Sequence, residues 1–280
     1  MLPREEYIEQ AYFFRVLQER LPENLPMQEL LAAVRDEVLS TTRLPLAIDF
    51  LLAELKHAGV FGTAMARLSH YFAPFQTYIV SEAENERGRF DLRVALAILQ
   101  AEADYRAREV TRQGLFVFQF ESLCRNRLRY DPGLAAIAED PFYDAAWREW
   151  ILTVRRQVGI VDFADMVYVR SQHYLASRRQ QELAPPDQPI LFGEKEGKIA
   201  LANRRKDPLY LFAALQRQLG YPAVPRPRRP DEAPQLVPQL ARRVERLEMR
   251  LKIIEEEQRG GFDLSRFYGP HGRGEPPPGG

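Results

Sequence analysis

A heptad repeat of apolar residues near the C-terminal end constrains the fold of this chain more than any other feature. Within residues 236–259, apolar side chains alternate at spacings of four and three residues, at Leu240, Val244, Leu247, Leu251 and Ile254. This spacing places them along one stripe of an α-helix, at heptad positions a and d. A lone helix of about 30 Å is not stable in water. The sequence therefore predicts a parallel coiled coil over residues 236–259.

Charged residues beside the stripe indicate how the helices pair. Arg243 and Arg250 occupy position g, and Glu248 and Glu255 occupy the following positions e. In a parallel, in-register assembly these pairs bring opposite charges together between neighbouring strands. Both segments resemble the Arg-h-x-x-h-Glu pattern of short trimeric coiled coils, in which the arginine stem covers the apolar core. This resemblance implies a homotrimer.

The apolar residues themselves leave the number of strands open. Val244 with Leu247 favours two strands, whereas Leu251 with Ile254 favours more than two, so a homodimer is the alternative to the trimer. A helix that packs on its own body, or an antiparallel pair, would also bury the stripe.

Residues 1–182 have the periodicity of a helical body. The chain has 280 residues, of which 45% are hydrophobic, and this is enough for one large core or two smaller ones. No strand–helix alternation and no G-x-G-x-x-G motif is present, which argues against a dinucleotide-binding or TIM-barrel fold. We expect a mainly α protein built as an irregular multi-helix bundle, with an α-solenoid as the alternative. Helical spacing predicts helices over residues 3–21, 27–40, 45–58, 64–87 with a kink at Pro74, 91–112, 115–130, 140–158 and 162–179.

The pattern changes after residue 182. Residues 183–221 are expected to form a short β-hairpin, with strands 190–192 and 198–201, and then a helix that begins at Asp207-Pro208 and ends at Gly220. This segment is expected to pack on the body. Residues 222–235 are Pro-rich and predict a semi-rigid linker. Residues 260–280 are rich in Gly and Pro and predict a disordered tail.

One pair of residues has the spacing of a metal site. Glu54 and His57 form an E-x-x-H motif, which places both side chains on one helix face, as in diiron helical bundles. Such a site needs a second E-x-x-H and further carboxylates, and no second motif occurs in the chain. We therefore expect a structural surface pair, no metal and no cofactor, and Glu54 with His57 remain the candidate ligands of an alternative metal-binding or enzymatic function.

Residues 203–229 are locally basic and are the candidate anion site. They could hold a phosphate, an acidic protein or a nucleic acid. Neither basic cluster contains an aromatic residue, which favours a solubilising segment over nucleic-acid binding. The basic residues are Arg204, Arg205, Lys206, Arg226, Arg228 and Arg229.

The tail contains apolar residues that disordered segments usually lack. It could fold back on the coil or body, or it could serve as a partner-binding peptide. The residues concerned are Phe262, Leu264, Phe267 and Tyr268.

These patterns favour a non-enzymatic, homo-oligomeric interaction or scaffold protein. A helical enzyme or metal-binding protein and an anion-binding protein are the alternatives. The net charge is zero, which gives no global reason for a nucleic-acid partner. A single cysteine, Cys124, excludes an intrachain disulfide and is expected to be buried. No apolar run reaches the length of a membrane span and the N-terminus lacks a signal-peptide pattern, so we expect a cytoplasmic protein with no membrane partner.

Overall fold

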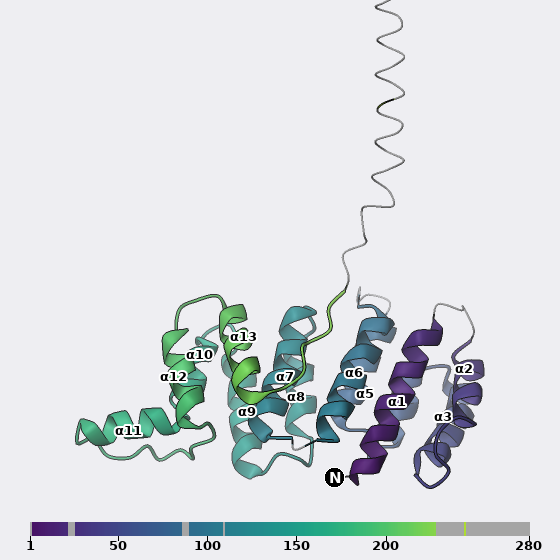
Figure 1. Ribbon diagram of the computed structural model, residues 1–280, viewed down its shortest axis with the longest axis horizontal. Helices are drawn as coiled ribbons and strands as arrows, with labels where there is room; N and C mark the ends of the chain where they lie inside the picture. Colours follow the sequence, from purple (N-terminus) through teal and green to yellow (C-terminus); the bar gives the residue numbers. More distant parts are fainter. Residues whose placement is uncertain (1, 22–25, 86–89, 109, 228–243, 245–280) are drawn as a thin grey trace, which may run out of the picture. The chain divides into compact units, whose positions relative to one another are not determined.

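The computed structural model describes residues 2–21, 26–85, 90–108, 110–227 and Val244 (Figure 1). These residues are mainly helical and contain no β-sheet, so the predicted mainly α class is confirmed. The chain divides into two compact units, Met1–Pro227 and Arg228–Gly280. The helices named in the described part of the chain are α1 (Arg4–Arg20), α2 (Met27–Arg35), α3 (Leu44–Ala58), α4 (Phe61–Arg67), α5 (Pro74–Glu84), α6 (Leu92–Arg106), α7 (Arg112–Arg125), α8 (Tyr130–Ala138), α9 (Ala145–Gln157), α10 (Phe163–Tyr168), α11 (Gln172–Gln180), α12 (Glu194–Ala202) and α13 (Pro208–Leu219).

Local sequence signals set several helix ends. Gly59 after α3 and Gly220 after α13 both adopt a left-handed backbone conformation with φ of 68°, which glycine tolerates without steric cost. The Asp207 side chain caps α13 by accepting a hydrogen bond from the Leu209 N–H at 2.9 Å.

A single helix was expected over residues 115–130, although its start also resembles a strand. Residues 115–125 are helical as expected, but α7 ends at Arg125 and Tyr130 begins the separate helix α8.

Two other predicted long helices are each divided in the structure. Residues 64–87 were expected to be one kinked helix, but α4 and α5 are separate and Pro74 is the first residue of α5. Proline forces the preceding Ala73 into an extended conformation, so it ends one helix and begins another. Residues 162–179 form α10 and α11, because the Ser171 side chain caps a new helix by accepting the Tyr174 N–H.

The predicted β-hairpin over residues 190–201 is wrong. Residues 194–202 form α12, which includes the whole of the expected second strand. Glu194 and Glu196 lie in the first turn, where carboxylates stabilise the positive end of the helix dipole, and Lys198 pairs with Glu194 at 2.6 Å one turn later. These helical signals outweigh the short apolar run that suggested a strand.

Residues 190–192, the expected first strand, contact the segment before α11 and not residues 198–201. The Leu191 and Phe192 N–H groups both donate to the Arg170 carbonyl, at 2.8 and 3.0 Å, and Phe192 forms an isolated bridge with Ser171. Gly197 of α12 lies against the same place, because a Cβ at this position would come within 2.2 Å of Ser171 Oγ. Close approach of α12 to the start of α11 therefore requires a glycine at this position.

Helices far apart in the sequence lie side by side in the first unit. α1 packs along α6, and α13 returns to pack on α7, whereas most other contacts join helices close in sequence. In Figure 1, α1 lies between the α2–α3 pair and the α5–α6 pair. In a solenoid each repeat contacts only its neighbours, so these two pairs depart from that architecture.

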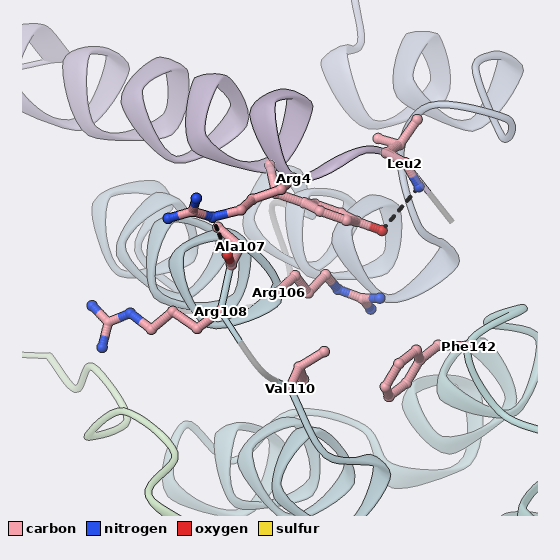
Figure 2. Close-up of a pocket in the computed structure, with 8 residues that line it drawn as sticks. Leu2, Arg4, Arg106, Ala107, Arg108, Val110 and Phe142 are labelled. Atoms are coloured by element: carbon pink, nitrogen blue, oxygen red, sulfur yellow. Dashed lines mark hydrogen bonds between the residues drawn. The ribbon is translucent and has the colours of Figure 1, made fainter.

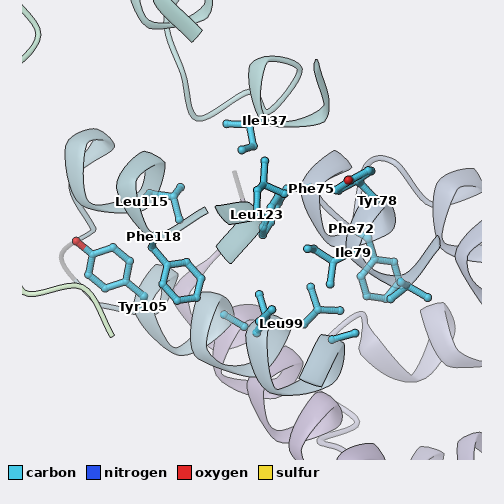
Figure 3. Close-up of a cluster of buried hydrophobic side chains, with 14 of the residues drawn as sticks. Phe72, Phe75, Tyr78, Ile79, Leu99, Tyr105, Leu115, Phe118, Leu123 and Ile137 are labelled. Atoms are coloured by element: carbon cyan, nitrogen blue, oxygen red, sulfur yellow. The ribbon is translucent and has the colours of Figure 1, made fainter. Parts of the chain in front are cut away.

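Large side chains from α5, α6, α7 and α8 pack together in a buried cluster (Figure 3). Phe75, Leu99 and Phe118 have no exposed surface, and Leu123 and Ile137 are equally buried. Burial of many such side chains is the dominant stabilising contribution to a helical unit of this kind.

A second group of buried rings joins α7 to α9, α10 and α13. The ring centroid of Phe116 lies 4.8 Å from that of Trp150 and 5.9 Å from that of Trp147. Phe116 also stacks on Phe120, with centroids 5.9 Å apart. Tilted and edge-on ring pairs at these separations stabilise beyond their buried area. The cluster continues through Phe163, Phe192 and Phe212.

Residues 221–227 of the described chain pack on the helical unit after α13 ends. Tyr221 and Val224 are buried, and the Tyr221 hydroxyl donates to Glu121 Oε2 at 2.7 Å. The Asn126 side-chain amide donates to the Pro225 carbonyl at 3.2 Å. The first part of the Pro-rich stretch expected to act as a linker is therefore held against α7.

None of the helices described here is long and apolar enough to cross a membrane. Of the predicted coiled coil, only Val244 belongs to the described residues, and it is helical with about half of its surface exposed.

Candidate functional site

The structure places Glu54 and His57 on α3, as the sequence predicted, and gives Glu54 a basic partner. The Glu54 carboxylate accepts a hydrogen bond from Arg67 Nη1 on α4. His57 is exposed. No group of three or more His, Cys, Asp or Glu side chains suited to a metal ion occurs among the described residues. Glu54 therefore joins α3 to α4.

Two residues of the basic segment 203–229 bond to acidic residues of α10 and its N-terminal cap. Arg204 forms an ion pair with Asp165, and its guanidinium lies 5.3 Å from the centre of the Tyr168 ring. The Arg205 backbone N–H donates to Asp162 Oδ2 at 2.6 Å. Arg204 thus ties the α12–α13 connection to α10. Lys206 and Arg226 are exposed, and Arg228 and Arg229 lie outside the described residues.

The coiled-coil and tail candidates lie outside the described residues, apart from Val244. The coil residues are Leu240, Arg243, Leu247, Glu248, Arg250, Leu251, Ile254 and Glu255, and the tail residues are Phe262, Leu264, Phe267 and Tyr268.

Two buried carboxylates on α1, Glu6 and Glu9, accept hydrogen bonds from other parts of the chain. Glu6 accepts hydrogen bonds from the Tyr71 hydroxyl at 2.9 Å and from the Arg43 N–H at 2.8 Å. Glu9 accepts the Leu39 N–H at 2.9 Å. Burial and the nearby Glu6 carboxylate raise the pKa of the Tyr71 hydroxyl well above its ordinary value. These carboxylates hold the connection before α3 to α1, because buried acceptors need such donors.

An apolar pocket of about 350 Å³ lies between α7, α9, α10 and α13. Phe120, Phe163 and Phe212 form its walls, and Cys124 and Ile160 also line it. Ile160 is 83% exposed, so apolar surface continues from the pocket to the outside. The pocket suits an aliphatic or aromatic group.

The Cys124 thiol is expected to react slowly with alkylating agents. Burial raises its pKa to about 12, so very little reactive thiolate exists at pH 8. Alkylation of the folded protein by iodoacetamide, followed by mass spectrometry, should proceed at least about a hundredfold more slowly than alkylation of the protein unfolded in guanidinium chloride. Equal rates in the two states would show that the thiol is accessible and ionised.

A larger cleft of about 700 Å³ opens where the start of α1 meets the end of α6 (Figure 2). We call it the arginine cleft because three arginines line it. Its described lining includes no acidic residue. The lining residues are Leu2, Arg4, Tyr7, Arg106, Ala107, Arg108, Val110 and Phe142.

Arg106 is held in the cleft by a buried ion network. Its Nη2 donates to Glu102 Oε1 at 2.9 Å and to the carboxylate of Asp140. Burial alone would lower the pKa of Arg106, but the two carboxylates outweigh burial and hold the pKa well above its ordinary value. Gln119 and Tyr143 extend the network, because Gln119 donates to Glu102 at 2.6 Å and accepts the Tyr143 hydroxyl at 2.8 Å. Arg106 therefore stays charged.

Two atoms of this network have no hydrogen-bond partner among the described residues. They are Arg106 Nε and Glu102 Oε2. A buried donor on a charged group is costly to leave unpaired. Arg106 is thus a fixed, desolvated cation whose Nε–H group has no hydrogen-bond acceptor among the described residues.

The other two arginines of the cleft are exposed. Arg4 donates through Nε to the Ala107 carbonyl at 3.0 Å, which fixes its stem across the end of α6. Arg108 has no side-chain hydrogen bond or ion pair with the described residues. Figure 2 shows the side chains of Arg4 and Arg108 extending in the same direction, whereas Arg106 extends toward the side where Phe142 lies.

Sequence reasoning missed the arginine cleft. One local signal was available, because Glu102 and Arg106 continue the apolar face of Ala95 and Leu99 at helical spacing, and charged residues on a buried face are usually paired. The contribution of Arg4 and Phe142 has no local signal, since Arg4 and Ala107 are 103 residues apart.

Comparison of the chain with protein-family models, with curated proteins and with solved structures gives no match.

Proposed function

We propose that the protein is a non-enzymatic interaction protein that assembles as a homotrimer through residues 236–259. The observation that carries this proposal is the heptad stripe with two Arg–Glu pairs in the same heptad phase. Association buries the stripe, which a single helix of this length cannot do.

The division of the chain supports this arrangement. Met1–Pro227 is a compact unit with its own core, and the coil sequence follows it after a short Pro-rich stretch. Three copies of one unit on one coil bind a multivalent partner more tightly than a single copy does. The exposed side chain of Ile160 lines the apolar pocket between α7, α9, α10 and α13. Apolar surface of this kind can bind an aliphatic or aromatic side chain of a partner protein.

Truncation after Pro234 tests the assembly. The molar mass measured by light scattering is expected to fall from three chains of 32.4 kDa toward one. Leu247→Asp should have the same effect, because each strand would bury an unpaired charge at the seam. Met249→Asp is the matched control, since residue 249 occupies the outer position f and should leave the mass unchanged.

Two outcomes would contradict this proposal. A truncated protein that keeps its full-length mass would show that the helical unit itself makes the oligomer. A full-length protein that is monomeric at micromolar concentration would show that residues 236–259 do not assemble the protein.

The flanking charges give a finer test of parallel pairing. Replacing both Arg243 and Arg250 by Glu sets like charges against Glu248 and Glu255 and should weaken association. Adding Glu248→Arg and Glu255→Arg should restore part of it, because opposite charges again face each other. Sedimentation equilibrium gives the association constants, and no difference between the two variants would exclude these pairs.

A further inference from the structure

We propose that the arginine cleft binds a small phosphate monoester that carries an apolar body. This site is separate from the proposed assembly through residues 236–259, and neither proposal depends on the other. The proposal rests on two exposed arginines that form no ion pair with the described residues, one buried arginine and an apolar wall, all of which line the same cleft.

The two exposed arginines supply the charge for the phosphate group. Within the described part of the chain, Arg4 donates a hydrogen bond through its Nε to Ala107 and none through its two terminal amino groups, which can therefore bind a ligand. Arg108 makes no hydrogen bond or ion pair through its side chain with the part of the chain that the structure describes. A phosphate monoester carries a charge of about −1.5 to −2 at pH 7, which matches two guanidinium groups. Guanidinium forks bind phosphate oxygens in pairs of parallel hydrogen bonds.

Arg106 is a buried arginine of the cleft wall that its ion pairs hold in one position. It is 6% exposed, and Glu102 and Asp140 fix its guanidinium in place. Its Nε has no partner among the described residues, although it is buried. Because Glu102 and Asp140 balance its charge, Arg106 contributes a rigid side chain to the cleft wall, and the charge that attracts the phosphate comes from Arg4 and Arg108.

The remaining lining residues are apolar or aromatic. Tyr7 and Phe142 contribute aromatic rings to the described lining, and Leu2, Ala107 and Val110 contribute aliphatic groups. The Leu2 N–H donates to the Tyr7 hydroxyl at 3.3 Å, which holds Leu2 against the wall of the cleft. A volume of about 700 Å³ is in the range of small-molecule sites. The ligand therefore needs an apolar part as well as a phosphate.

Phenyl phosphate is the probe that combines both parts. Isothermal titration of the full-length protein at constant ionic strength should give a dissociation constant below about 1 mM. Inorganic phosphate lacks the ring, benzyl alcohol lacks the charge, and phenylacetate has only one negative charge. Each of these three is expected to bind at least about tenfold more weakly than phenyl phosphate.

Variants locate the binding in the cleft. Arg4→Gln and Arg108→Gln should each weaken phenyl phosphate binding about tenfold or more, because each removes charge-assisted hydrogen bonds. Arg15→Gln is the matched control, since Arg15 is an exposed arginine of α1 that does not line the cleft. The affected side chains are exposed, so circular dichroism should show unchanged folding.

Three results would overturn the proposal. The first is no heat of binding at 10 mM phenyl phosphate. The second is equal affinity for phenyl phosphate and either phenylacetate or inorganic phosphate. The third is an equal effect of Arg15→Gln and the two cleft variants.

Discussion

Replacing Phe116 by alanine is expected to lower the free energy of unfolding by about 3–5 kcal/mol. Phe116 has no exposed surface, and its ring contacts Trp147, Trp150 and Phe120. These neighbours belong to α7 and α9, so a cavity at this point loosens the contact between two helices. Helices fixed on both sides cannot close fully around the missing ring, and the cavity adds to the lost transfer free energy.

Urea unfolding followed by circular dichroism measures this effect. The matched control is Tyr210→Ala, because Tyr210 is an aromatic residue of α13 that is 66% exposed, and its replacement should change the free energy by less than about 0.5 kcal/mol. All variants are compared at one protein concentration, since an oligomer is stabilised by mass action. Equal effects of the two substitutions would show that the ring cluster does not contribute as described.

The sequence predicted those parts of the fold that depend on nearby residues. The Asp207 cap, the left-handed Gly59 and Gly220 and the helical character of residues 115–125 all follow from interactions within a few residues. Such signals survive in the folded chain because no long-range contact opposes them.

The predicted hairpin failed for a physical reason. The short apolar run at Ile199 and Ala200 suits a strand or a buried helix equally well, and tertiary contacts decided between them. Ala200 is completely buried in α12, and Gly197 approaches Ser171 of the preceding segment. Neither contact can be inferred from the residues of the segment itself.

The arginine cleft was unpredictable for the same reason. Arg4 lies at the start of α1, whereas Arg106 and Arg108 lie at and just after the end of α6. The packing of α1 on α6 brings them together, and it joins parts of the chain that are far apart in sequence. The i, i+4 pair of Glu102 and Arg106 was visible, but its third member, Asp140, lies 34 residues away from Arg106. Only the fold shows that the pair is buried at the wall of a cleft.

Truncation after Gly220 is expected to destabilise the helical unit by about 2.5–6 kcal/mol relative to truncation after Pro227. The shorter chain loses Tyr221, whose side chain is buried and whose hydroxyl also donates to the Phe212 carbonyl at 3.0 Å. Burial of a large aromatic side chain contributes about 1.5–3 kcal/mol. Loss of its hydroxyl leaves Glu121 without one of its donors, at a cost of about 1–3 kcal/mol.

Single substitutions in the Pro227 truncation separate these two contributions. Tyr221→Phe keeps the ring and should cost only the hydrogen-bond part, about 1–3 kcal/mol, whereas Tyr221→Ala should approach the effect of the shorter truncation. Tyr210→Phe is the matched control, because this hydroxyl belongs to an exposed residue and its loss should leave the free energy of unfolding unchanged.

Limited proteolysis of the full-length protein should yield a resistant fragment that ends near Pro227, because residues 221–225 are held by Glu121 and Asn126. A resistant fragment that ends at Gly220, together with equal stability of the two truncations, would show that this segment does not belong to the folded unit.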